Sequence, residues 1–231
     1  MKTIGLIGGM SWESSIEYYR IINQETRRRL GGLHSAKSIM LSVDFAEIEG
    51  LQDQGRWDEA GTLLTTAGQN LEAGGADFVV LCTNTMHKVA ADIQANINIP
   101  LLHIADATAR KIKQEGIGRI ALLGTRFTME EDFYKGRLTR TSGLDVLIPE
   151  PDEIATVNRI IYDELCMGKI LQDSKAAYAQ IMEGLVKKGA QGIILGCTEI
   201  GLLVQQPDST VPLFDTTKIH AEAAVAYALE D

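Results

Sequence analysis

The segment GADFVVLCTNT, from Gly75 to Thr85, returns in altered form as GAQGIILGCTE, from Gly189 to Glu199. The two copies keep one register, in which Leu81 corresponds to Leu195. Each copy is an apolar, β-rich run that opens with glycine and ends in small and hydroxyl residues. This pattern is typical of a buried strand followed by a turn. The chain is therefore expected to contain two copies of one structural unit.

The repeat changes directly after the strand, at the position best placed for chemistry. At the shared offset Thr83 corresponds to Cys197, whereas Cys82 corresponds to Gly196. A pseudo-symmetric protein of this kind is expected to place two like residues across one cleft. Here one of them is a hydroxyl and the other a thiol, which predicts an asymmetric site formed by Thr83 and Cys197.

Further apolar runs lack strict alternation, which favours parallel strands that are covered on both faces. Helical patterns lie between them, such as Ala60, Leu63, Leu64, Ala67 and Leu71 on one face. The alternation predicts an α/β fold: two pseudo-symmetric three-layer α/β domains with mainly parallel sheets and an interdomain active-site cleft. The expected strands are 3–8, 38–43, 78–81, 120–124, 146–148 and 192–195.

Two further matches indicate the domain boundaries. Residues 3–10 match 119–129, and the proline-led segment 99–105 matches 211–217. We expect a first α/β domain at 1–100 plus 209–231 and a second at 101–208. The helix expected near the C-terminus would then return to the first domain.

Composition disfavours several classes of function. The 231 residues carry a formal net charge of -9, and binding to nucleic acid requires clusters of Lys and Arg. No apolar run approaches the roughly 18 residues of a membrane span, so we expect no membrane association. The three cysteines lack CxxC spacing and the four histidines lack HxxxH spacing, which predicts neither disulfides nor a metal site. A cytoplasmic protein with free thiols is expected.

Ligands of parallel sheets bind beyond the carboxyl ends of the strands, where N–H groups of following helices point outward. Cys197 is the strongest candidate there, because a helix N-terminus stabilises a thiolate and lowers the pKa of the thiol. Cys82 and Cys166 are interpreted as core residues. Four turns suited to holding a carboxylate are Gly8-Gly9-Met10-Ser11, Thr83-Asn84-Thr85, Gly124-Thr125-Arg126 and Cys197-Thr198-Glu199.

Three histidines lie near the expected site. His87 is one helical turn beyond Thr83, and His103 and His220 follow the two proline-led segments. Each is interpreted as a structural histidine with satisfied hydrogen bonds, the alternative being a role in reaching or orienting the cleft.

Three motifs resemble the signatures of the aspartate/glutamate racemase family: IGGMSWESS at 7–15, VLCTNTMH at 80–87 and LGCTEI at 195–200. The resemblance spans nearly the whole chain. It implies an isomerase that acts on a small-molecule amino acid without pyridoxal phosphate, metal or any other cofactor. In such enzymes two cysteines on opposite faces of the substrate α-carbon exchange its proton. The first cysteine corresponds here to Thr83 and the second to Cys197.

The resemblance also implies roles for neighbouring residues. It implies substrate cradling or tuning of the thiol for Asn84, Thr85, Thr198 and Glu199. It implies backbone or hydroxyl donors to the substrate at Met10, Ser11 and Thr125.

One departure from the family concerns specificity. Many aspartate racemases of this kind have an Arg directly after the Asp that ends the second strand, where this chain has Asp44-Phe45. The nearest later donors are Gln52 and Gln54. A neutral amide holds a carboxylate less strongly than a bidentate guanidinium does, which leaves a broader range of amino acids open.

Three hypotheses follow. The first is a racemase of aspartate, glutamate or a broader range of amino acids. The resemblance implies that the second cysteine, Cys197, removes the proton of the L-enantiomer, and because a hydroxyl at Thr83 is a poor base for the D-enantiomer, L-substrates are expected to be favoured. The second is a single-cysteine decarboxylase that resembles the arylmalonate decarboxylases. The third is an amino-acid-binding protein without turnover. The family resemblance implies a homodimer.

Overall fold

The computed structural model describes residues 1–230, which form two compact units. The first unit comprises Met1–Ile104 and the chain from His220 onward, and the second comprises Ala105–Ile219. Segment 209–219, which the repeat suggested for the first domain, lies in the second unit because its strand pairs with the second sheet.

The first unit is built on a four-stranded parallel sheet with the order β2-β1-β3-β4. Alternate residues of β3 enter different cores: Phe78 and Val80 pack on one face, and Val79 and Leu81 on the other. Burial on both faces explains why this strand reads as a continuous apolar run. The strands are β1 (Ile4–Gly8), β2 (Ser38–Ser42), β3 (Phe78–Leu81) and β4 (Leu101–Leu102).

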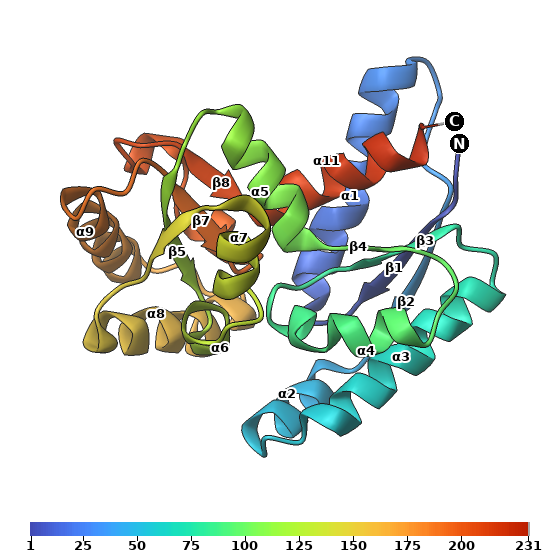
Figure 1. Ribbon diagram of the computed structural model, residues 1–231, viewed down its shortest axis with the longest axis horizontal. Helices are drawn as coiled ribbons and strands as arrows, with labels where there is room; N and C mark the ends of the chain where they lie inside the picture. The colour runs from blue at the N-terminus through green and yellow to red at the C-terminus, as the bar shows by residue number, and fades with distance from the viewer. Residues whose placement is uncertain (231) are drawn as a thin grey trace. The chain divides into compact units, whose positions relative to one another are not determined.

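Helices cover both faces of this sheet, α1 and α11 on one side and α2, α3 and α4 on the other (Figure 1). The predicted apolar stripe of α3 is confirmed, since Leu64, Ala67 and Leu71 enter the core. The 3-10 helix η1 (Thr85–Val89) follows β3. The helices are α1 (Trp12–Leu30), α2 (Phe45–Asp53), α3 (Trp57–Ala73), α4 (Ala90–Ala95) and α11 (Thr216–Ala228).

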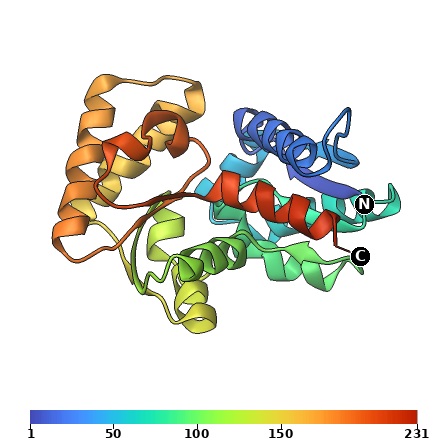
Figure 2. The same ribbon diagram turned by 90° about the horizontal axis from the view of Figure 1, so that it is seen from above.

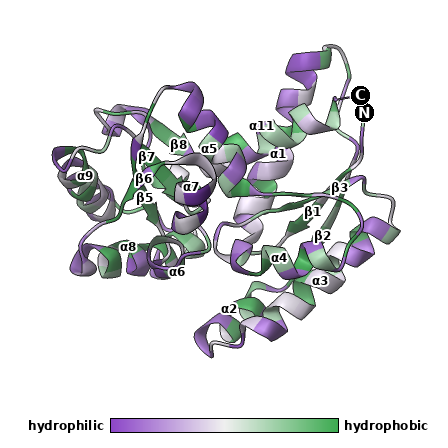
Figure 3. Cartoon of the chain, in the orientation of Figure 1, coloured by the Kyte–Doolittle hydropathy of each residue, from purple (hydrophilic) through white to green (hydrophobic). Residues whose placement is uncertain are grey.

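The second unit repeats the same topology. Its parallel sheet has the order β6-β5-β7-β8, and its strands share the apolar character of the first sheet (Figure 3). Its strands are β5 (Arg119–Gly124), β6 (Asp145–Leu147), β7 (Ile193–Gly196) and β8 (Leu213–Asp215). Figure 2 shows its helices around that sheet. They are α5 (Ile104–Gln114), α6 (Arg126–Glu130), α7 (Lys135–Ser142), α8 (Pro151–Asp163), α9 (Gln172–Lys187) and α10 (Ile200–Leu203), with the 3-10 turns η2 (Leu165–Met167) and η3 (Gln206–Asp208).

Sheet pairing confirms the register of the repeat. Ile7 of β1 pairs with Leu81 of β3, and Leu123 of β5 pairs with Leu195 of β7. Leu81 and Leu195 therefore occupy equivalent positions in the two sheets, and the predicted α/β class with two parallel sheets is confirmed. None of the helices within residues 1–230 is both long and apolar enough to cross a membrane.

Candidate active site

Each of the four turns named from the sequence follows a strand and leads into a helix. Ser11 is the N-cap of α1, and its hydroxyl accepts a hydrogen bond from a backbone N–H three residues on, at 3.5 Å. Thr125 caps α6 in the same way at 3.3 Å. Gly9 has a φ of 95°, and a Cβ there would lie 2.1 Å from Val43 O, so the glycine pair forms a tight turn against the end of β2.

The first unit brings two of these turns together. Because β1 and β3 are neighbours, the turn with Met10 and Ser11 lies beside the turn with Thr83, Asn84 and Thr85. All five residues are buried. Thr83 keeps 8% of its surface exposed, so its hydroxyl belongs to a turn that is tightly packed and still within reach of solvent.

Of the side chains considered for substrate selection, Gln52 contacts the segment that follows this turn. Buried Gln52 donates through Nε2 to Met86 Sδ of η1, at 2.9 Å, which ties α2 to the segment after Thr83. The Asp44 carboxylate instead caps α2, accepting from Ala46 N at 3.1 Å. Gln54 is exposed, and its Oε1 accepts a hydrogen bond from Arg56, so its role as a donor toward the substrate stays a prediction.

The second unit brings Thr125 beside Cys197, because β5 and β7 are neighbours. Cys197 Sγ donates a hydrogen bond to Glu199 Oε2 at 2.9 Å, and Thr198 Oγ1 donates to the same oxygen at 2.7 Å. Glu199 is 3% exposed and Cys197 is 9% exposed. A buried carboxylate thus lies within proton-transfer distance of the thiol.

The prediction that a helix N-terminus lowers the pKa of Cys197 was wrong. Burial raises the pKa of this thiol well above its ordinary value, and the negative charge of Glu199 raises it further. Helix α10 has only four residues, so it contributes little dipole to oppose these effects. Cys197 therefore rests as a thiol.

Cys82 is confirmed as a core residue. Its side chain is fully buried in the cluster between the sheet and helices α1 and α11, and burial raises the pKa of its thiol. The equivalent position in the second unit is Gly196, where a Cβ would lie 2.8 Å from Leu123 O. The position before the turn therefore packs against structure in both units, and the candidate chemistry falls one residue later, on Thr83 and Cys197.

Among the remaining candidates, two histidines are buried and hydrogen-bonded, and Cys166 is partly exposed. His87 and His220 are buried and hydrogen-bonded, as expected for structural histidines. Cys166 is only partly buried in η2, which corrects its assignment to the core. The sequence analysis did not identify Tyr18, which contacts His220 from a position 202 residues away, and no local pattern signals such a pair.

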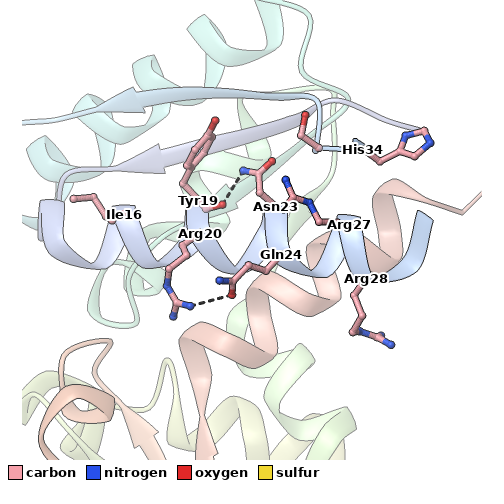
Figure 4. Close-up of a pocket in the computed structure, with 9 residues that line it drawn as sticks. Ile16, Tyr19, Arg20, Asn23, Gln24, Arg27, Arg28 and His34 are labelled. Carbon is pink, nitrogen blue, oxygen red and sulfur yellow. Dashed lines mark hydrogen bonds between the residues drawn. The ribbon is translucent and has the colours of Figure 1, made fainter. Parts of the chain in front are cut away.

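A surface hollow of about 640 Å³ lies on the outer side of α1 and contains none of the predicted site residues (Figure 4). It is lined by Ile16, Tyr19, Arg20, Asn23, Gln24, Arg27, Arg28, His34 and Ser35. Within residues 1–230, no group of three or more His, Cys, Asp and Glu side chains is placed to hold a metal ion.

Comparison with known proteins identifies the family of this chain. The family model for Asp/Glu/hydantoin racemases matches residues 7–224. The chain belongs to this family and is accordingly an isomerase, an amino acid racemase of the Asp/Glu type.

Individual relatives agree with this assignment. A crystal structure from Yersinia pestis, described as a candidate Asp/Glu racemase, is 59% identical with a TM-score of 0.94, and the match covers 100% of both chains. An aspartate racemase homologue from Pyrococcus horikoshii OT3 is 35% identical with a TM-score of 0.86, again over 100% of both chains. The broad-specificity amino-acid racemase RacX of Bacillus subtilis (strain 168) is 25% identical over 169 residues, which is 73% of this chain and 72% of RacX.

Proposed function

We propose that this racemase exchanges the α-proton of its substrate without a cofactor, with Cys197 as base toward the L-enantiomer and Thr83 on the opposite face of the α-carbon. The observation that carries this proposal is the 2.9 Å hydrogen bond from the Cys197 thiol to the buried Glu199 carboxylate. The equivalence of Thr83 and Cys197 in the two sheets supports the pairing. The proposal requires both turns to meet one substrate.

The reaction begins with a neutral thiol. Cys197 passes its proton to Glu199, which leaves a thiolate and a neutral carboxylic acid. The thiolate then removes the α-proton of the L-substrate and becomes a thiol again, and the electron pair stays on the α-carbon. The Thr83 hydroxyl passes a proton to the opposite face while it takes one from a water molecule, so the D-enantiomer forms without a free alkoxide. The hydroxide left in solvent is neutralised by the proton that Glu199 releases, which restores the starting state.

The groups proposed for the two faces of the α-carbon differ in their strength as bases. A thiol with a carboxylate neighbour can lose its proton, whereas the alkoxide of Thr83 is inaccessible near neutral pH without an activating partner. Removal of the α-proton from an L-substrate is therefore fast and removal from a D-substrate is slow. Because the two enantiomers have equal free energies, net inversion has the same kcat/KM in both directions, and the asymmetry appears in the exchange of the α-hydrogen.

The substrate range extends beyond aspartate and glutamate. Asp44 is engaged as a helix cap and Gln52 is a neutral amide, so the acidic side chain meets no guanidinium at this point. Weak selection for a second carboxylate favours a range of amino acids that includes neutral side chains.

Single-thiol chemistry also admits a decarboxylase of the arylmalonate type. Burial of Cys82 favours this alternative, because Cys197 is then the one thiol available at the proposed site. In that reaction the protonated Cys197 would deliver its proton to one face of a carbanion after loss of carbon dioxide.

Proton exchange in deuterated water tests the proposal. The unmodified protein is incubated with L- and D-aspartate, L- and D-glutamate and a panel of neutral amino acids, and the α-deuterium content and chirality are followed. Exchange that Cys197→Ser abolishes supports the racemase. Release of carbon dioxide from arylmalonates without amino-acid exchange would instead establish the decarboxylase, and binding without either reaction would establish a binding protein.

A homodimer formed through α1 is the proposed assembly. Trp12, Ile16 and Tyr19 repeat at helical spacing along α1 and are 61%, 52% and 55% exposed, and Leu33 beyond the helix is 98% exposed. A contiguous exposed apolar stripe of this kind marks an interaction surface.

Charge favours a second copy as the occupant of this surface. Helix α1 has Glu13 in its first turn and Arg27, Arg28 and Arg29 in its last turn, where Arg28 and Arg29 share one carboxylate, Glu25, and leave the end net positive. An antiparallel pairing of two α1 helices around a twofold axis would set the acidic end of each helix against the basic end of its partner. The hollow beside Ile16 and Tyr19 would receive the partner's apolar side chains.

A further inference from the structure

Three histidines and one tyrosine form a cluster that contacts Thr83 through His87, and the proposed reaction uses none of them. His87, His220 and Tyr18 are 3%, 0% and 0% exposed. The ring of His87 lies 4.5 Å from that of His103 and 5.9 Å from that of His220, centroid to centroid. All four residues belong to the first unit.

His87 connects two pieces of backbone. Its Nδ1 lies 2.7 Å from Thr83 O, and the backbone N–H of Ile104 donates to its Nε2 at 3.2 Å. A backbone N–H can only donate and a carbonyl can only accept, so Nε2 has the lone pair and Nδ1 has the hydrogen. These two partners fix a neutral ring in one tautomer.

His220 holds the neighbouring backbone in the same manner. Its Nε2 donates to Leu102 O at 2.8 Å, and its Nδ1 lies 2.8 Å from the hydroxyl of Tyr18. The residues on either side of His103 are thus held by the two buried histidines, Leu102 by His220 and Ile104 by His87.

The cluster coincides with both places where the chain changes unit. Ile104 is the last residue of the first unit before the chain leaves it, and His220 is the first residue after the chain returns. The carbonyl of Thr83 is therefore hydrogen-bonded, through one ring, to the backbone at the exit point, and His220 packs against that ring from the point of return.

We propose that His87 is a positioning residue for Thr83. By holding the Thr83 carbonyl through Nδ1, it fixes the orientation of the residue that delivers the proton on the face opposite Cys197. This inference rests on the proposed function. His87 acts through the Thr83 backbone, and its second bond to Ile104 fixes the tautomer that the first bond requires.

Two substitutions separate the two hydrogen bonds of His87. The amide of His87→Asn sits where Nδ1 does, so it can still donate to Thr83 O but cannot reach Ile104 N. The amide of His87→Gln sits where Nε2 does, so it can still accept from Ile104 N but loses the donor to Thr83. Tyr18→Phe is the matched control, because it also removes one buried hydrogen bond from the cluster without touching His87.

The measurement is the ratio of inversion to retained α-deuterium exchange, starting from an L-substrate in deuterated water. Retained exchange requires only the Cys197 face, whereas inversion also requires the proton from the Thr83 face. We expect His87→Gln to lower this ratio about tenfold, and His87→Asn and Tyr18→Phe to leave it within about threefold, although all three lower the melting temperature. Equal proportional losses of both processes in all three variants would overturn the positioning role.

A second measurement does not depend on the variants. Nitrogen NMR of the unmodified protein is expected to show His87 with a protonated Nδ1 and an unprotonated Nε2, and a charged ring or the opposite tautomer would overturn the inference. Absence of α-proton exchange from every amino acid in the unmodified protein would overturn the proposed function and this role together. Exchange in the unmodified protein with an unchanged ratio in His87→Gln would overturn this role alone.

Discussion

The thiol of Cys197 donates to Oε2 of Glu199 across 2.9 Å, in a turn where the thiol is 9% exposed and the carboxylate 3%. This pair combines a proton donor whose pKa is raised by burial and by the nearby negative charge with an acceptor that can receive that proton. In the proposed mechanism, this resting thiol becomes a base only when its proton moves to Glu199.

Replacing the carboxylate tests this pairing. Glu199→Gln keeps the size of the side chain and removes both its charge and its capacity to take a proton, so we expect kcat to fall about 100-fold or more. The pKa of the Cys197 thiol should also fall, because the negative charge that raised it is gone. The rate of iodoacetamide alkylation against pH checks this shift, with Cys197→Ser as the blank. An unchanged alkylation profile together with unchanged kcat would show that Glu199 does not act on the thiol.

The raised pKa of Cys197 also predicts a dependence of stability on pH. The fold favours the neutral thiol, so its contribution to stability is complete below the ordinary thiol pKa, about 8.5, and is lost as the pH rises through and beyond that value. We expect the urea midpoint to fall between about pH 8.5 and 10.5. The fall should be shallower in Cys197→Ser, because serine does not ionise there while Cys82 and the buried tyrosines are retained. Parallel curves for the two proteins would contradict this prediction.

The fold was largely predictable because its main signals are local. The runs that became β1, β3, β5 and β7 are continuous and apolar, and they were placed within one residue. Strands β4 (Leu101–Leu102) and β8 (Leu213–Asp215) were interpreted as connecting segments. A strand of two or three residues is too short to show a periodic pattern of apolar residues. These two segments are strands only because they pair with β3 and β7.

The residue types of the candidate site are a prediction from the sequence, whereas its electrostatics come only from the structure. The offset of the repeat predicts Cys197 and Thr83, but the effect of Glu199 on the thiol depends on the Glu199 side chain, which folds back to reach the residue two positions before it. Gln52 and Gln54 are equivalent in the sequence, and only the winding of α2 buries the first and exposes the second. The contact between Tyr18 and His220 joins the two ends of the chain, so no spacing rule could indicate it.

Cys82 should be dispensable for activity. Cys82→Ala removes one buried sulfur from the cluster with α1 and α11, so we expect a loss of about 1 kcal/mol in the free energy of unfolding. Racemisation and the rate of inactivation by iodoacetamide should both stay within twofold of the unmodified protein. Protection from iodoacetamide in Cys82→Ala would place the reactive thiol at Cys82 and contradict the assignment to Cys197.

The α1 surface can be tested by a single charge. Ile16→Glu places a carboxylate in the middle of the exposed stripe, and we expect a dimer to dissociate toward a species of 25.2 kDa, the mass of one chain. Met167→Glu is the matched control, because Met167 is 66% exposed and belongs to the second unit, whereas α1 belongs to the first. Light scattering after gel filtration measures both masses. A monomer in the unmodified protein, or a dimer that persists in Ile16→Glu, would argue against this interface.

Thr83→Cys is the sharpest test of the asymmetric site. Under the proposed mechanism, Cys197 removes the α-proton of an L-substrate, while the Thr83 hydroxyl is too weak a base to act on a D-substrate at comparable speed. We therefore expect α-deuterium exchange from L-aspartate to exceed exchange from D-aspartate by about tenfold or more at early times. A thiol at position 83 supplies the missing base, so Thr83→Cys should raise exchange from the D-enantiomer selectively. Thr83→Ser is the matched control, since it keeps a hydroxyl and should keep the asymmetry. Equal early exchange from both enantiomers in the unmodified protein would refute the assignment of Thr83 and Cys197 to opposite faces.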